Sequence, residues 1–529
     1  MTLPSAPSTG PVAETLSGQL RGIVKDGVFA FRGIPYGAPA GGGARFRIAQ
    51  PAPPWSGVRD ASGFGDRAMQ AHRPHAAPFE WLDSPRPMSE DCLSLNVTTP
   101  GPEGRRDVMV WLHGGAFAFG SGDLPGYDPA PLVRRKDVVV VTLNHRLNLF
   151  GYLTPTTGDD RFATAANNGM LDIVLALEWV RDNIAAFGGN PGSVTLFGQS
   201  GGGAKVAILM AMAEARGLFH KAIIQSTSSG FRVQEADAAH EATERLLHRL
   251  SLGPADFAQL QTVPAARLLA EMPAVTEAMG GDNFRPAIDG RVLGAHPFVP
   301  QAPGLSRDIP MLIGHTADEM RFFLASDPNR GRIDAADARR RLARFLPVDE
   351  TTVDALIALY AQEAPDQGPE ARLAVIAGDY MYRAAALEGA EARARQSGAA
   401  PVWFYDFRWR SPAQDGYLGA PHTAEIPFIF GQTDLARDFT GGTEDARALS
   451  HRMMDIWAAF AATGDPGGAA GPDWPPYDMA ARRTMILGDG PARVESDPLA
   501  RRRAAIAALP RCVPGAAYAF RSEYDEAPA

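Results

Sequence analysis

The chain has 529 residues, of which 45% are hydrophobic, and this is enough to bury a large core. Its formal net charge of -9 excludes the basic surface of a general nucleic-acid-binding protein, and the lack of an 18-residue apolar run excludes a membrane-spanning helix. The chain has two cysteines, Cys92 and Cys512, so we expect a reduced, cytoplasmic protein without a disulfide framework. The start, MTLPSAPSTGP, lacks the basic and apolar regions of a signal peptide.

The first half of the chain alternates between strand-like and helix-like patterns. Residues 1–14, which begin with many Pro, Ser and Thr residues, are expected to form a flexible tail. We predict strands at residues 18–31, 93–97, 108–112, 138–143, 193–197 and 221–225. We predict helices at residues 171–187 and 201–213. This alternation indicates an α/β protein, in which a parallel sheet is wrapped by helices.

The second half is mostly helical and rich in alanine. Two helical excursions are expected, at about residues 234–300 and 325–397, and a short strand at 311–313 lies between them. Further strands are predicted at 402–407 and 484–487, with helices at 446–462 and near the end. There is no internal repeat and no clean linker, so we expect a single domain from residue 15 to residue 523 that carries the two excursions.

The stretch TLFGQSGGGAK at residues 195–205 raises the question of a phosphate loop. Gly198 and Gly203 have the spacing of the pattern G-x-x-x-x-G-K-[ST], but Ala204 stands where the lysine belongs and Lys205 follows one position late. Val206 then lacks the hydroxyl group that would hold magnesium. These departures argue against a nucleotide site.

The same stretch matches the nucleophile pattern G-x-S-x-G in full, with Gly198, Ser200 and Gly202. The pattern falls between a predicted strand and a predicted helix, where a sharp turn holds a serine hydroxyl above the sheet and small neighbours allow close approach. The backbone N–H of Gly201 is then expected to point at the same place as the hydroxyl. Ser200 is therefore a candidate nucleophile.

A nucleophilic serine needs a base and an acid that orients the base. His422 lies in a Gly/Pro-rich loop after the predicted strand at 402–407. The other histidines after Ser200 mostly lie in segments with a helical pattern or beside apolar strands. Functional side chains on such sheets follow the carboxyl ends of strands. By the same rule, the acid follows the strand at 311–313, and the residues alone leave Asp318 and Glu319 both open.

A second glycine loop follows the predicted strand at 108–112. The sequence HGGAF at residues 113–117 matches the HGGG-type loop, whose backbone N–H groups stabilise the negatively charged oxygen formed during acyl transfer. This loop precedes Ser200 in the chain, as that arrangement requires.

With these motifs, the chain resembles the type-B carboxylesterases, a branch of the α/β-hydrolases that includes bacterial para-nitrobenzyl esterases and cholinesterases. The resemblance covers most of the chain. It is carried by FRGIPYG (31–37), EDCLSLNV (90–97), WLHGGAF (111–117), NHRLNLFGYL (144–153), GNPGSVTLFGQSGGG (189–203), FHKAIIQS (219–226) and GAPHTAEIPFIFG (419–431). It implies an α/β-hydrolase fold, with a large, mostly parallel sheet flanked by helices and helical insertions that form a cap near the active site.

The resemblance also implies roles for individual residues. Ser200 would be the nucleophile and His422 the base, and Glu319 rather than Asp318 would be the acid. Ser226 resembles a hydroxyl that supports the acid. The family usually has Glu where this chain has Gln199, and this neutral side chain weakens the case for a cationic substrate. The implied oxyanion donors are the backbone N–H groups of Gly115, Ala116 and Gly201.

The function that follows is a serine carboxylesterase, which hydrolyses small-molecule esters through an acyl-enzyme without a metal ion or an organic cofactor. A carbamate or amide hydrolase with the same residues is an alternative, and so is a catalytically silent, cholinesterase-like binding module. Silent modules lack at least one triad residue, whereas this chain has all three. Four phenylalanines either line the substrate pocket or belong to the core: Phe117, Phe119, Phe322 and Phe323.

Overall fold

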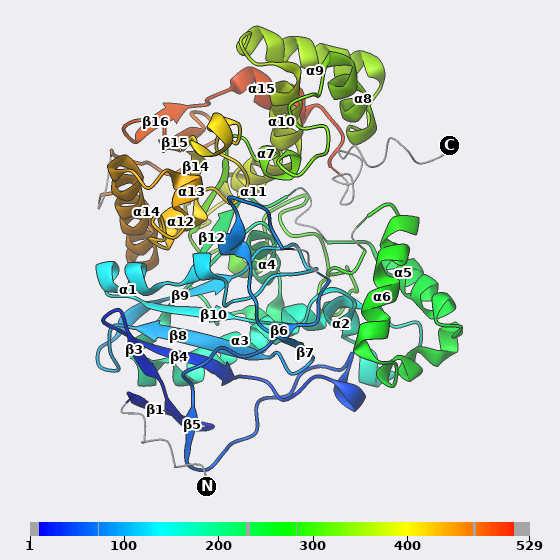
Figure 1. The fold of residues 1–529 in the computed structure, drawn as a ribbon, viewed down its shortest axis with the longest axis vertical. Coiled ribbons are helices and arrows are strands. Elements are labelled where there is room, and N and C mark those ends of the chain that lie inside the picture. The colour runs from blue at the N-terminus through cyan, green and yellow to red at the C-terminus, as the bar shows by residue number, and fades with distance from the viewer. Residues whose placement is uncertain (1–9, 72–73, 229–232, 282, 469–471, 513–529) are drawn as a thin grey trace.

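The computed structural model describes residues 10–71, 74–228, 233–281, 283–468 and 472–512. One large sheet runs through the centre, with helices on both of its faces (Figure 1). Across these described ranges, no helix combines the length and the apolar character needed to cross a membrane.

The central sheet has eleven strands among the described residues. Its seven middle strands, in the order β15-β14-β13-β12-β11-β9-β10, are all parallel. Antiparallel strands complete both edges: β16 lies beside β15 at one edge, and β8, β4 and β3 follow β10 at the other. This confirms the predicted α/β-hydrolase sheet. The strands are β3 Ile23–Lys25, β4 Val28–Pro35, β8 Ser94–Thr99, β9 Arg106–Leu112, β10 Val139–Leu143, β11 Gly189–Gln199, β12 Lys221–Gln225, β13 Met311–Thr316, β14 Val402–Phe407, β15 Arg483–Leu487 and β16 Arg493–Ser496.

Strand β9 shows how the sheet separates two hydrophobic cores. Successive side chains of a strand point to opposite faces. Val108 and Val110 pack into a core with α3 (Asn168–Asn183) and α4 (Gly201–Leu209). Trp111 packs into the other core, with α1 (Ala130–Lys136) and α14 (Glu444–Thr463). Because both faces are covered, the middle strands are continuous apolar runs, as VVVTL in β10 illustrates.

The two helical excursions lie at the edges of the molecule, where α5 and α6 form one group and α8 and α9 another (Figure 1). Each of these two groups contributes to a separate hydrophobic cluster, and both clusters also include residues from outside the excursions. A π-helical turn at Asp379–Arg383 joins α10 to α11. The helices of the excursions are α5 Ala236–Arg249, α6 Ala265–Ala278, α8 Ala335–Phe345, α9 Glu350–Glu363, α10 Pro369–Gly378 and α11 Ala384–Arg395. The remaining helices are α2 Asn148–Tyr152, α7 Arg321–Leu324, α12 Ile426–Ile429, α13 Arg437–Thr440 and α15 Ala500–Ala507.

The structure corrects the predicted elements near the N-terminus. Strand β1 (Val12–Thr15) lies inside the predicted tail, because its alternate side chains are buried and it pairs with β2 (Gly18–Arg21). β2 also pairs with β5 (Val58–Asp60). The predicted strand at 18–31 is divided into β2, β3 and β4. Residues 1–9 of the predicted tail lie outside the described ranges.

Two further corrections concern short strands. β6 (Arg67–Ala68) pairs with β7 (Met88–Ser89), and β16 forms the edge of the central sheet beside β15. None of these three was predicted, because two-residue strands and the polar sequence RVES of β16 carry no apolar alternation. An edge strand needs no continuous apolar run, since it is covered less completely than the middle strands.

Candidate active site

The turn at Ser200 is strained and can be built only from small residues. Ser200 has φ 59° and ψ -123°, between β11 and α4. A Cβ atom on Gly202 would lie 1.9 Å from the carbonyl oxygen of Leu112, and one on Gly201 would lie 2.2 Å from that of Ala116. Backbone atoms cannot move aside cheaply, so both positions require glycine. Ser200 remains half-buried above the sheet, while the strand before it is buried.

The HGGAF loop after β9 lies against this turn. Gly115 and Ala116 both have left-handed φ, at 86° and 54°. The Cα atom of Ala116 lies 2.5 Å from the place that a Cβ on Gly201 would occupy, so the loop and the first turn of α4 touch backbone to backbone. Gly201 is the first residue of α4, and its N–H therefore has no acceptor within the helix.

His422 and Glu319 form a buried pair. The His422 Nδ1 atom lies 2.5 Å from Glu319 Oε2, and the two side chains are 3% and 1% exposed. The backbone N–H of Thr316 donates to Glu319 Oε1 at 2.9 Å. Burial alone would raise the pKa of Glu319, but His422 and this N–H bring the pKa below its usual value. The carboxylate is therefore ionised and oriented at the imidazole ring.

Asp318 has different partners, so the geometry distinguishes the two acids. Its Oδ2 accepts the backbone N–H of Ala420 at 3.0 Å, and its Oδ1 lies 3.5 Å from Arg321 Nε. Burial raises the pKa of Asp318, although Arg321 opposes this effect. Asp318 thus holds the loop before His422, while Glu319 contacts the ring itself.

Gln199 and Ser226 complete the immediate surroundings of the pair. Gln199 Nε2 lies 3.2 Å from His422 Nε2, so the loop of His422 lies over the turn that carries Ser200. The same Gln199 Nε2 lies 3.4 Å from His422 Nδ1, so the amide group is close to both ring nitrogens. The Ser226 hydroxyl helps to lower the pKa of Glu319, although it approaches the carboxylate without meeting hydrogen-bond geometry.

Three aromatic rings surround His422. The ring centroids of Tyr382, Phe323 and Phe322 lie 4.7, 5.6 and 6.0 Å from that of His422. The sequence singled out both phenylalanines but missed Tyr382, which comes from the π-helical turn and belongs to no recognisable motif. Whether these rings contact substrate stays a prediction.

The other two phenylalanines of the predicted pocket differ in exposure. Phe117 is fully buried, with its ring 5.3 Å from that of Tyr152, which is the placement of a core residue. Phe119 is half-buried, and its carbonyl oxygen lies 2.2 Å from the place of a Cβ on Gly115. Phe119 thus lies beside Gly115, whereas the side chain of Phe117 is buried in the core.

A second buried carboxyl group lies close to the pair. Glu425 Oε1 accepts from Gln225 Nε2 at 3.1 Å, and Gln225 Oε1 accepts from Trp457 Nε1 at 3.1 Å. Burial, followed by the charge of Glu319, raises the pKa of Glu425 to about 8. Glu425 is therefore protonated at neutral pH. Glu425 is not among the residues predicted from the sequence, although a glutamate within the apolar run AEIPFIF is a visible signal.

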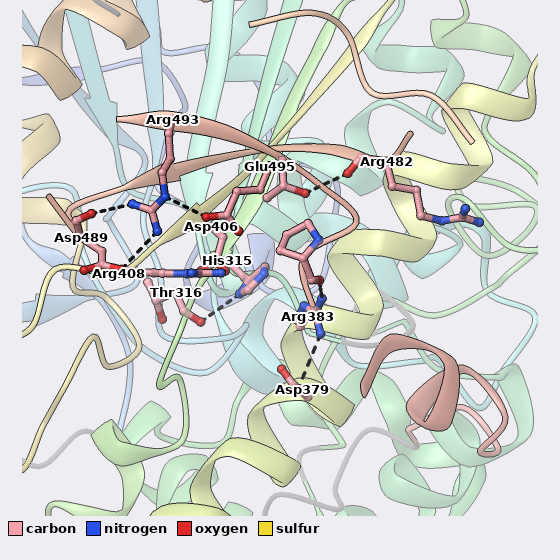
Figure 2. Close-up of polar contacts among 12 residues, drawn as sticks. His315, Thr316, Asp379, Arg383, Asp406, Arg408, Arg482, Asp489, Arg493 and Glu495 are labelled. Atoms are coloured by element: carbon pink, nitrogen blue, oxygen red, sulfur yellow. Dashed lines mark hydrogen bonds and ion pairs between the residues drawn. The ribbon is translucent and has the colours of Figure 1, made fainter. Parts of the chain in front are cut away.

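A separate polar cluster surrounds His315 (Figure 2). His315 on β13 is the register partner of Asp406 on β14, and its Nδ1 lies 3.0 Å from the carbonyl oxygen of Thr316. Asp406 forms an ion pair with Arg408 at 2.8 Å, while Arg383 donates to the carbonyl oxygen of Pro498. The Nδ1 atom of His315 thus has a backbone partner within this cluster. Within the described ranges, no group of three or more His, Cys, Asp or Glu side chains is arranged to hold a metal ion.

A strained serine on a strand–helix turn and a buried Glu–His pair, on a mostly parallel sheet, define an α/β-hydrolase. The family model described as "Carboxylesterase family" matches residues 9–505, and the chain belongs to this family. It is accordingly a carboxylic ester hydrolase that acts on small-molecule esters.

Individual relatives agree with this family. The chain is 36% identical over 502 residues to the para-nitrobenzyl esterase of Bacillus subtilis (strain 168), which covers 94% of this chain and 98% of that protein. It is 35% identical to the phenmedipham hydrolase of Pseudarthrobacter oxydans, covering 92% and 97%. Among solved structures, a thermophilic PNB esterase matches with a TM-score of 0.81 and 34% identity, over 94% of this chain and 100% of that one. A Geobacillus stearothermophilus carboxylesterase, EST55, also has a TM-score of 0.81, with 36% identity over 93% and 99%.

Proposed function

We propose that this ester hydrolase works through a Ser200–His422–Glu319 triad. The observation that carries the proposal is the buried 2.5 Å contact between His422 and Glu319 beside the strained turn of Ser200. His422 Nε2 takes the proton of the Ser200 hydroxyl, and the Ser200 oxygen attacks the ester carbonyl carbon. Glu319 orients the ring and stabilises the imidazolium that forms. The contacts of Gln199 with the His422 ring support this role, because Gln199 directly precedes Ser200 in the chain.

The negative charge on the carbonyl oxygen is stabilised by the backbone N–H groups of Gly115, Ala116 and Gly201. The backbone contact between Ala116 and Gly201 supports this arrangement. When the tetrahedral intermediate collapses, the imidazolium protonates the leaving alcohol. Water then attacks the acyl-enzyme by the same steps and releases the acid. Loss of one oxyanion donor typically lowers turnover by about 10²–10³-fold.

Labelling with a fluorophosphonate probe tests the nucleophile. We expect stoichiometric labelling at Ser200, and loss of both labelling and ester hydrolysis in Ser200→Ala. Ser193→Ala is the matched control, because Ser193 is a serine of β11 whose hydroxyl is bonded to Asp107 at the other end of the strand. Hydrolysis that persists in Ser200→Ala, by protein freed of wild-type contamination, would disprove the triad.

We further propose that esters are preferred over carbamates and amides with the same acyl group. The triad itself does not choose among them, but an alkoxide leaves more readily than an amine, and the carbonyl group of an ester is less stabilised by resonance. Comparison of kcat/KM for a matched ester, carbamate and amide tests this order. A value for the amide or carbamate equal to that for the ester would contradict it.

We also propose a cytoplasmic location. The two cysteines, Cys92 and Cys512, are buried and form no disulfide bond with each other, which fits a reducing compartment. Burial raises the pKa of the Cys92 thiol, so Cys92 stays protonated and inert. Fractionation of cells that express the full chain tests the location, and esterase activity confined to the periplasm or medium would contradict it.

A further inference from the structure

Lys205, which the phosphate-loop pattern singled out, is buried beneath the proposed oxyanion loop. It lies on α4, five residues after Ser200, and is 0% exposed. A fully buried lysine is rare, because removal of an ammonium group from water is costly unless polar groups replace the solvent. Lys205 therefore needs a structural or functional reason.

Lys205 contacts the HGGAF loop at two points. Its Nζ donates to the carbonyl oxygen of His113 at 3.0 Å and to that of Ala116 at 2.9 Å. The same Nζ lies 5.3 Å from the centroid of the Phe117 ring. The two anchored peptide groups flank the N–H groups of Gly115 and Ala116, so a single side chain of α4 holds the segment that supplies two of the proposed oxyanion donors.

We propose that Lys205 is a positioning residue for the oxyanion hole, which fixes the loop from beneath and places a positive charge behind it. This inference rests on the proposed role of the loop. Hydrogen bonds from a charged donor are shorter and stronger than neutral ones, so the two carbonyl groups are held firmly. A fixed cation near the site where negative charge develops stabilises the transition state without reorganisation.

The backbone of the loop shows why such an anchor matters. Ala116 has φ 54°, a left-handed conformation that a residue with a Cβ atom rarely adopts. Conformations of this kind persist only where surrounding contacts impose them. Lys205 donates a hydrogen bond to the carbonyl oxygen of Ala116, so it helps directly to hold the strained conformation.

Two buried histidines, His113 and His145, are close enough for the charge of Lys205 to act on them. The rings of His113 and His145 stack with centroids 5.0 Å apart, and each donates Nδ1–H to a backbone carbonyl group. Burial, followed by the charge of Lys205, lowers the pKa of His113 to about 3, and the same causes lower the pKa of His145. Both rings are therefore neutral.

The experiment compares Lys205→Met, Lys205→Gln and a matched control in the full-length enzyme. Methionine removes the charge and the hydrogen bonds, whereas glutamine keeps a neutral donor. The control is Lys221→Met, because Lys221 is another buried lysine, on β12, whose Nζ bonds Ser193 at the end of the sheet away from the loop. Active sites are counted by the endpoint of fluorophosphonate labelling, so turnover is expressed per folded site even where a variant folds in part.

Two measurements separate positioning from general stability. We expect Lys205→Met to lower kcat per site by about 10–100-fold with KM changed by less than about threefold. We expect the inhibition constant of a trifluoromethyl ketone to rise by a similar factor, because its hemiketal with Ser200 places a charged oxygen in the oxyanion hole. Lys205→Gln should fall between Met and the wild type, and Lys221→Met should stay within about twofold of the wild type.

Three results would overturn the inference: a kcat for Lys205→Met within about twofold of the wild type, a lowered kcat with unchanged trifluoromethyl ketone affinity, or an equal loss in Lys221→Met. Ser200→Ala keeps this outcome distinct from failure of the triad proposal. If Ser200→Ala is inactive while Lys205→Met is normal, only the role of Lys205 is wrong. If Ser200→Ala retains activity, the triad and the oxyanion hole fail together.

Discussion

At the level of single residues, Gln199 places a neutral amide, and no charge of its own, beside His422. Its Nε2 lies 3.2 Å from His422 Nε2. A carboxylate at that place would stabilise the protonated ring, because opposite charges within about 4–6 Å favour each other. We expect Gln199→Glu to move the acidic limb of the kcat/KM profile to higher pH by about one unit, since the ring must be neutral to act as a base.

The same substitution should raise kcat/KM for a substrate with a quaternary ammonium group relative to its neutral isostere. Profiles of kcat/KM against pH for the two substrates, recorded for the wild type and for Gln199→Glu, test both expectations. Gln199→Met, which lacks the charge and the amide, serves as the control and should not shift the limb upward. An identical acidic limb in Gln199→Glu would contradict the prediction.

Asp318 and Glu319 are adjacent, yet their contacts predict opposite consequences of substitution. Glu319→Gln should lower kcat by about 10³–10⁴-fold, because the amide cannot stabilise the imidazolium and favours the wrong tautomer. Asp318→Asn should keep kcat within about tenfold, while it lowers the thermal midpoint by weakening the contact with Arg321. Steady-state kinetics and thermal unfolding of both variants test the pair. Equal losses of kcat would remove the distinction.

At the level of elements, the turn between β11 and α4 depends on backbone contact with β9. A Cβ atom on Gly202 would overlap the carbonyl oxygen of Leu112. We expect Gly202→Ala to lower the free energy of unfolding by about 3 kcal/mol or more, because backbone on both sides must shift.

Gly43→Ala is the matched control for Gly202→Ala. No atom lies within 4 Å of the place of its Cβ, and its φ lies outside the left-handed range. Its effect should remain within about 0.5 kcal/mol. Urea unfolding of both variants measures the difference, and a stable Gly202→Ala protein with wild-type activity would show that the turn tolerates a side chain.

The positions of the loops that carry the proposed site follow from the order of the parallel strands. β13 and β14 are parallel neighbours, so the segments after their carboxyl ends meet at one edge, and this brings Glu319 and His422 together. The HGGAF loop and the Ser200 turn follow β9 and β11, which are also neighbours. The proposed site therefore spans the carboxyl ends of four strands of one parallel sheet.

At the level of the whole molecule, Glu425 couples stability to pH. Burial raises its pKa to about 8 from the usual 4.5, so the folded protein binds a proton that the unfolded chain releases. This contribution to the free energy of unfolding is complete below pH 4.5 and is lost as the pH rises toward 8, at up to about 1.4 kcal/mol per pH unit. Glu425→Gln should flatten the slope between pH 5 and 8, because glutamine does not titrate.

Urea unfolding of the wild type and of Glu425→Gln, at intervals across this pH range, tests the coupling. Glu444→Gln is the control, because the side chain of Glu444 is 89% exposed at the start of α14 and its removal should leave the slope unchanged. Parallel slopes for the wild type and Glu425→Gln would contradict the prediction.

The sequence by itself determined the parallel sheet, the turn at Ser200 and the loop of His422. Middle strands of a covered sheet must be apolar throughout, and a strained turn packed on backbone must be made of small residues, so both leave local patterns. The same patterns made the chain resemble the carboxylesterases, and the family model confirms that the chain belongs to this family.

Only the tertiary structure decided which side chains meet across the sheet. Spacing could not separate Asp318 from Glu319, and the contact with His422 does so. The places of Tyr382, Glu425 and Lys205 likewise depend on packing between distant segments, which leaves no local pattern. Burial then sets their chemistry, because a carboxyl or ammonium group removed from water takes its charge state and its partners from the residues that the fold places beside it.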